Sequence, residues 1–168
     1  GLYNLAAFYG FDSSNNNETL LAYTKALNPS ERKKLIASGV PADFLDLVKN
    51  YMAFLDSIGI TKQAIINGEN RIGGDKDNYK QYDAAFKLPY ASLNLDEFLA
   101  ESMSRRAFQR TLATLPSVAT RAKNALFDLF NVIGRVLGLP FNKSSLLSDV
   151  VTNFGRILSD PDNVPATG

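Results

Sequence analysis

Apolar residues recur at intervals of three and four along most of the chain, and no segment shows the strict alternation that is typical of a strand. The clearest stripe begins after Pro41 and runs to about Ser57, shortly before Gly59. Its apolar positions are Phe44, Leu45, Val48, Tyr51, Met52 and Leu55. This spacing places them on one face of a helix, which we expect to lie against a core. The pattern predicts an all-α protein, an irregular multi-helix bundle of about seven to nine helices.

Caps and helix breakers delimit most of the other predicted helices. Ser30 is expected to cap a helix over residues 31–38 that Gly39 ends. Asn94, with Glu97 three residues later, resembles a capping box at the start of another helix. Further helices are predicted over residues 18–27, 61–67, 79–86 and 105–115 and from a cap at residue 142 or 144 to residue 158.

The longest helix is predicted to begin at a cap on Ser117 or Thr120 and to reach Leu137, because Gly138 and Pro140 stop it. Its apolar stripe is Ala122, Leu126, Leu129, Phe130, Ile133 and Leu137. A stripe of this kind suits a membrane surface or a partner groove, but also a core. Core packing is favoured, because the polar face holds few lysines.

The chain is predicted to divide into an N-terminal helical part, 1–86, a C-terminal helical part, 87–160, and a flexible tail, 161–168. Residues 68–78 combine Gly73-Gly74 with alternating charges, which is typical of an exposed connector. A phosphate-binding loop is the less favoured interpretation, since the spacing of known phosphate-binding glycine motifs is absent. The first residue is Gly1, which we interpret as the start of a fragment, of a processed product or of a tag remnant.

The 168 residues include no histidine and no cysteine. A Ser-His-Asp triad, a Cys-His pair, a zinc-peptidase motif and a zinc finger are therefore excluded within this chain, and no cofactor is expected. Chemistry that uses carboxylates alone remains open, for example a two-acid glycosidase. It ranks last, because tryptophan, a common platform for sugars, is absent. On balance we expect no enzymatic activity.

Charge and hydropathy limit the partners. The formal net charge is +1, so the chain as a whole does not attract nucleic acid or an anionic membrane. No apolar run approaches the roughly 18 to 20 residues that cross a bilayer. Zero cysteine excludes disulfide bonds, so a secreted disulfide protein is not expected.

Three arginines are the candidate binding residues: Arg105, Arg106 and Arg110. Arg106 and Arg110 stand one helical turn apart and suit phosphates or the acidic surface of a partner. The competing interpretation, a solvated helix face, is favoured, because Phe108 is the one aromatic residue nearby. We expect a contact with nucleic acid to be weak.

The acidic residues Asp96, Glu97 and Glu101 precede these arginines. Glu97 and Glu101 share one helical face, which suits a metal or an acid/base pair, while Arg105 is placed to compensate Glu101. The favoured interpretation is structural, with acids near the positive end of the helix dipole. No metal site is therefore predicted from the residues alone.

One block of the sequence resembles a known family. An E-F-L-A-E helix at 97–101 is followed by F-Q-x-x-L at 108–112, by an amphipathic helix at 125–140 that ends in G-L-P, and by a last helix at 145–158. This pattern resembles a segment of the large polyvalent proteins, the very large multidomain polypeptides of phages and mobile elements.

The resemblance implies an all-helical, non-catalytic structural or interaction module of a larger phage protein. Such a module is expected in the virion, or injected with the DNA into the bacterial cytoplasm. Its partners would be other parts of the same polypeptide or other virion proteins. The resemblance also implies an alternative, a fragment or inactive remnant of a zincin-like metallopeptidase. Glu97 or Glu101 would then be a zinc ligand only together with histidines from outside this chain.

Overall fold

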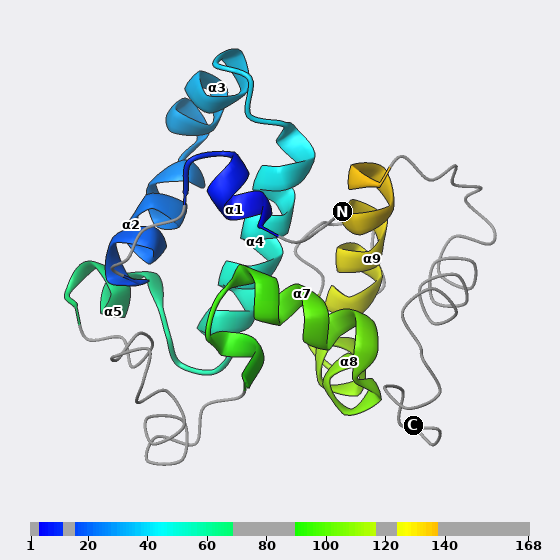
Figure 1. Ribbon diagram of the computed structural model, residues 1–168. Helices are drawn as coiled ribbons and strands as arrows, with labels where there is room; N and C mark the ends of the chain where they lie inside the picture. Colours follow the sequence, from blue (N-terminus) through cyan, green and yellow to red (C-terminus); the bar gives the residue numbers. More distant parts are fainter. Residues whose placement is uncertain (1–3, 12–15, 69–89, 117–123, 138–168) are drawn as a thin grey trace. The chain divides into compact units, whose positions relative to one another are not determined.

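The computed structural model describes residues 4–11, 16–68, 90–116 and 124–137. Over these residues it contains eight α-helices, one short 3-10 helix and no strand, so the predicted all-α multi-helix bundle is confirmed. The helices are α1 (Leu5–Phe8), α2 (Asn16–Ala26), α3 (Pro29–Ala37), α4 (Ala42–Ser57), α5 (Lys62–Ile66), η2 (Tyr90–Ser92), α7 (Leu95–Ser104), α8 (Arg106–Ala113) and α9 (Ala125–Val136) (Figure 1). Among them, none has the length and apolar character that crossing a membrane requires.

Contacts divide the chain into two compact units. The N-terminal unit ends at Phe98 and the C-terminal unit begins at Leu99, so that the division falls inside α7. The boundary predicted between residues 86 and 87 lies outside the described residues, as does the predicted tail. Most of the predicted connector, 68–78, also lies outside the described residues. So do the helix predicted at 79–86 and the last predicted helix, which ends at residue 158.

The core of the N-terminal unit is built around α4. Packed against α2, this helix is buried on most of its circumference. All six apolar positions of the predicted stripe are buried, and Leu47 and Phe54 are buried as well. Because both the stripe and its flanks are buried, α4 is surrounded by other parts of its unit and does not merely cover one side of the core. The helix ends before Gly59, whose φ of 88° suits the left-handed position that follows many helices.

Aromatic rings extend through this core as a continuous series. In contact order they are Phe8, Tyr9, Phe44, Phe11, Tyr23, Tyr51, Phe98 and Phe54. Successive centroids lie between 4.9 and 6.2 Å apart, the range of favourable ring contacts. The series links α1, α2 and α4 to the first turns of α7, and its outermost member, Phe8, is 79% exposed.

The start of α3 corrects one prediction. The N-cap is Asn28, not Ser30: the Asn28 side chain accepts a 3.1 Å hydrogen bond from the main-chain N–H group of Ser30. Pro29 occupies the first helical position, where its missing N–H group costs nothing. The helix therefore begins at Pro29, directly after its cap. The predicted end is confirmed, since Gly39 has a φ of 108°.

In the C-terminal unit α8 packs against α9. The α9 helix buries Leu129, Phe130 and Ile133 of the predicted stripe, whereas Leu137 is 37% exposed. Its start corrects a second prediction. Asn124 is the N-cap, in an extended conformation, and its side chain accepts a 3.0 Å hydrogen bond from the N–H group of Phe127. A helix cannot run through an extended residue, so no continuous helix runs from Ser117 or Thr120 to Leu137.

Candidate functional site

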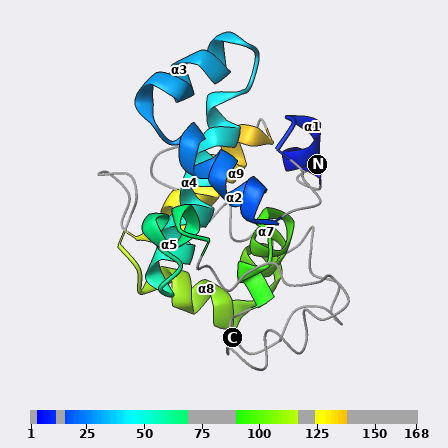
Figure 2. The ribbon, with the colours of Figure 1, turned by 90° about the vertical axis from the view of Figure 1, so that its left-hand side faces the viewer.

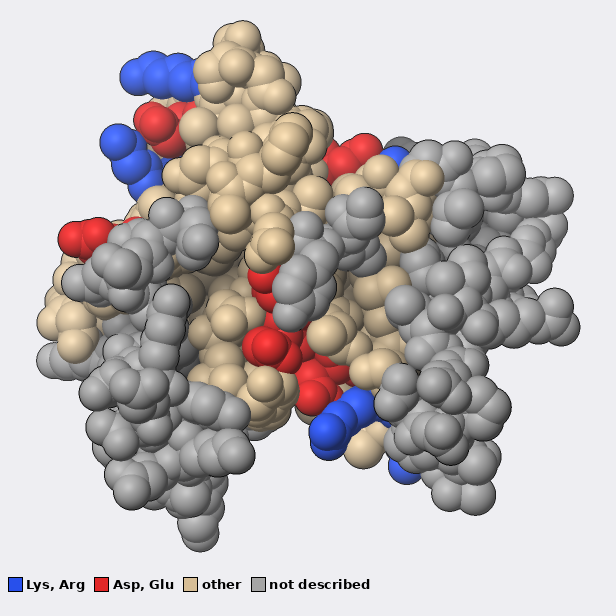
Figure 3. Space-filling model, viewed as in Figure 1, with Lys and Arg blue, Asp and Glu red and all other residues tan. Residues whose placement is uncertain are grey.

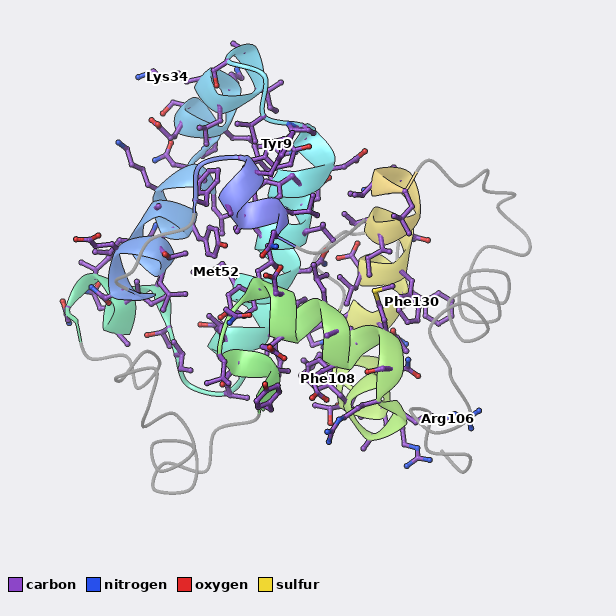
Figure 4. The ribbon with its side chains drawn as sticks, in the orientation of Figure 1. Tyr9, Lys34, Met52, Arg106, Phe108 and Phe130 are labelled. Atoms are coloured by element: carbon purple, nitrogen blue, oxygen red, sulfur yellow. The ribbon has the colours of Figure 1, made fainter. Side chains whose placement is uncertain are left out.

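The predicted arginines lie on or beside α8, a helix with two contrasting faces. Phe108 and Leu112 are buried on one side, while Arg106 and Arg110 are exposed on the other. The two arginines are four residues apart and therefore neighbours on the helix surface. Figure 4 shows the Arg106 side chain extending away from the ribbon. The sequence-based expectation that Arg106 and Arg110 share one face is thus met.

Two hydrogen bonds hold α8 in place within its unit. The Gln109 side-chain N–H group donates to the main-chain oxygen of Ser102, at the end of α7, over 2.8 Å. The Ala125 N–H group donates to the main-chain oxygen of Leu115 over 3.0 Å, which joins the residues after α8 to the start of α9. Phe108 and Leu112 of α8 are buried as well, so α8 presents its arginines from a fixed helix.

Arg105 differs from the other two arginines. Its Nε atom donates to Oε2 of Glu101 over 2.9 Å, as the i,i+4 spacing predicts. The Arg105 side chain is 65% exposed, whereas the Glu101 side chain is 11% exposed. The pair therefore neutralises a carboxylate that the protein covers. Arg105 therefore serves first to stabilise Glu101.

Arg106 and Arg110 form no ion pair within the described parts of the chain. Figure 3 shows cationic side chains gathered over α8. We call Arg106 and Arg110, with Arg105 at their edge, the basic α8 face. Guanidinium groups bind carboxylates and phosphates through two parallel hydrogen bonds, and like charges one turn apart repel until an anion lies between them. The chemistry of this face is therefore anion recognition.

The acidic residues of α7 form no comparable site. Asn94 caps the helix through a 2.8 Å hydrogen bond from the N–H group of Glu97, which confirms the cap predicted there. Asp96 accepts a 3.1 Å hydrogen bond from the main-chain N–H group of Asn4, and Glu101 is paired with Arg105. In the part of the chain that the structure describes, no three acidic residues are arranged to hold a metal ion. The structural interpretation of these acids agrees with this geometry.

A second basic feature was not singled out from the sequence. Lys33 and Lys34 are exposed on α3, in the N-terminal unit. The signal available was the adjacent pair of lysines within a helix that has few apolar residues. Such a pair alone does not show whether a helix covers a core, so nothing in the sequence distinguishes it from other surface lysines.

Comparison of the chain with protein-family models, with curated proteins and with solved structures finds no significant match.

Proposed function

We propose that this chain is a non-catalytic interaction module of a larger phage protein, carried in the virion or injected with the DNA. Its basic α8 face would bind an acidic surface of another virion protein or of another part of the same polypeptide. One observation carries the binding site: Arg106 and Arg110 are exposed one turn apart, without an ion pair among the described residues, on a helix whose opposite face is buried.

The phage origin rests on the sequence pattern. The E-F-L-A-E motif lies in α7, F-Q-x-x-L lies in α8, and the amphipathic segment that begins at Ala125 forms α9. Three successive helices with a buried α8–α9 contact agree with an all-helical module. This agreement supports the proposal.

The experiment compares phage particles that carry the parent gene in three forms. Quantitative mass spectrometry of purified particles should detect this chain in the wild type. Arg106→Glu with Arg110→Glu should lower its amount about tenfold, because reversal replaces attraction by repulsion at an anionic partner. Lys49→Glu with Lys62→Glu makes the same change in net charge at exposed positions of the N-terminal unit and should leave the amount unchanged.

Two results would count against the proposal. Absence of the wild-type chain from purified particles removes the virion role. Equal incorporation of the arginine variant removes the basic α8 face as the binding site. Binding of the wild-type chain to double-stranded DNA that the arginine variant lacks would instead assign the face to phosphates. The net charge of +1 does not favour this result.

The metallopeptidase alternative makes a different prediction. A zinc ligand on α7 would have to be Glu97 or Glu101, and Glu101 already holds Arg105 at 2.9 Å. We expect this chain alone to bind no stoichiometric zinc. A zinc-peptidase motif upstream in the parent reading frame, together with zinc binding that Glu101→Gln abolishes, would favour the peptidase instead.

A further inference from the structure

One side of the α3 helix is exposed to solvent, while Glu31, Arg32 and Leu35 are half-buried. None of its nine residues is buried, and it projects from the N-terminal unit in both views of the ribbon (Figures 1 and 2). Lys33, Lys34 and Ala37 are exposed, and Ile36 is 41% exposed. Helical geometry places Lys33 between Ile36 and Ala37 on one outward surface, with Lys34 at its edge. We call these four residues the outer α3 face.

This helix is held by its capped ends, by contacts with α2 and by an ion pair with α4. Asn28 caps the first turn, and Gly39 allows the N–H group of Val40 to reach the main-chain oxygen of Leu35 over 3.0 Å. Arg32 donates to Asp46 of α4 over 3.1 Å. An isolated helix of nine residues is marginal in water, and most helices in proteins are stabilised by a buried face. Here the caps, the contacts with α2 and the Arg32–Asp46 pair fix the helix and leave its outer side uncovered.

The outer α3 face is cationic. Lys33 and Lys34 form no ion pair within the described residues, whereas Arg32 is neutralised by Asp46. Figure 4 shows Lys34 extending outward from the helix, and the space-filling view shows cationic side chains over this end of the unit (Figure 3). Next to these charges lie the half-exposed Ile36 and the small side chain of Ala37.

We propose that the outer α3 face docks an acidic amphipathic helix of a partner protein. Carboxylates on the partner would pair with Lys33 and Lys34, and an apolar side chain would cover Ile36, while Ala37 permits close approach of the two backbones. Because α3 is already helical and fixed, little ordering cost falls on this side of the contact.

The same surface suits other anionic partners less well. A membrane gains about 1 kcal/mol for each lysine near an anionic surface, and Ile36 is the one large apolar side chain that this helix exposes. Single-stranded nucleic acid is bound largely through base stacking on aromatic side chains, and α3 contains no aromatic residue. Charge together with apolar character therefore favours a protein helix.

The test uses the whole chain and a synthetic probe. The probe is a terminally blocked peptide helix with leucine along one stripe and glutamate at the flanking positions. Binding is followed by the amide signals of the isotope-labelled chain in nuclear magnetic resonance. The signals of α3 should shift, and Lys33→Glu with Lys34→Glu should weaken binding about tenfold or more. Lys33→Gln with Lys34→Gln gives a smaller loss in the same direction and guards against a folding defect, which circular dichroism checks.

The matched control is Lys49→Glu with Lys62→Glu, which makes the same change in net charge at exposed positions outside α3 and should bind the probe as the wild type does. The lysine variants of α3 leave the basic α8 face intact, so their effect separates the present inference from the function proposed for that face. Shifts confined to α8, equal binding of a peptide with scrambled leucine positions, or equal binding of the lysine variants would overturn the proposal. So would tighter binding to phosphatidylserine vesicles or to single-stranded RNA than to the peptide.

Discussion

The hydroxyl group of Tyr51, in α4, donates a 2.8 Å hydrogen bond to the main-chain oxygen of Ser92, which lies 41 residues later in the chain. Both residues are buried, and the Tyr51 ring contacts Tyr23 and Phe98. This bond links the central helix of the N-terminal unit to the segment that precedes α7. Burial raises the pKa of the Tyr51 phenol well above its usual value, and the neighbouring Tyr23 adds to the shift.

Replacement of Tyr51 by phenylalanine tests the contribution of this hydrogen bond. The ring contacts with Tyr23 and Phe98 remain, but the main-chain oxygen of Ser92 loses the hydrogen bond from Tyr51. We expect the free energy of unfolding to fall by about 1–2 kcal/mol. Tyr51→Ala should cost about 3–5 kcal/mol, because a cavity is added. Urea unfolding measures both, and a phenylalanine variant as stable as the wild type would contradict the assigned role.

The raised pKa of Tyr51 also makes stability depend on alkaline pH. In the unfolded chain the phenol loses its proton near pH 10, whereas in the folded chain it keeps the proton to higher pH. The folded state then binds more protons, so the free energy of unfolding falls as pH rises. This contribution is complete below about pH 10 and is lost as pH rises through the raised pKa.

Unfolding measured at about pH 8 and about pH 11 isolates the effect of Tyr51 from that of the other tyrosines. The wild type should lose more stability between the two conditions than Tyr51→Phe does. An identical loss in the two proteins would show that Tyr51 does not couple deprotonation to unfolding.

Periodicity predicted the core helix α4, because the spacing of its apolar residues along the chain does not depend on which helices pack around it. It did not predict that Leu47 and Phe54 are buried too. Periodicity identifies the most apolar side of a helix, but how much of the remaining circumference is covered depends on which helices pack around it. Conversely, Leu115 is apolar and lies three residues after the buried Leu112, but it is only half-buried.

The two errors at helix starts have one cause. Ser30 and Thr120 are good cap residues by type, yet asparagines at 28 and 124 are the caps. Several residues near each start can accept a hydrogen bond from the first turn, and residue type alone does not rank them. The cap is the residue whose backbone is extended where the chain enters the helix. Residue type does not determine which backbone position is extended.

Asn124→Ala should therefore destabilise the C-terminal unit by about 1 kcal/mol, the usual value of a lost N-cap. Asn124→Asp retains an acceptor for the N–H group of Phe127 and should be nearly neutral. Asn131→Ala, within α9, removes the same side chain without removing a cap and serves as the control. Thermal unfolding of the three variants distinguishes a cap from a general effect of asparagine.

The candidate site was predictable only in part. Spacing alone predicted that Arg106 and Arg110 share a face and that Arg105 compensates Glu101, because both relationships lie within one or two helical turns. It could not predict that Glu101 is 8% exposed, since the depth of a helix face in a fold is set by distant residues. The outer α3 face escaped prediction for the same reason.

Glu101→Gln tests the difference between the two glutamates of α7. A neutral amide cannot sustain the ion pair with Arg105, so we expect a loss of about 1–2 kcal/mol in the free energy of unfolding. Glu97→Gln, whose main-chain N–H group still reaches Asn94, should change stability by about 0.5 kcal/mol or less. Equal effects of the two substitutions would show that the Arg105 pair does not stabilise the unit.

The two faces of α8 predict opposite consequences for binding and stability. Phe108→Ala removes a buried ring and should lower the free energy of unfolding by about 3–5 kcal/mol. Arg106→Ala with Arg110→Ala, on the exposed face, should leave it within about 0.5 kcal/mol per residue, because no ion pair within the described residues is broken. Urea unfolding and particle incorporation, measured on the same proteins, give the comparison. If the arginine variant lost stability as Phe108→Ala does, these side chains would serve the fold, and the basic α8 face would have to be abandoned as a binding surface.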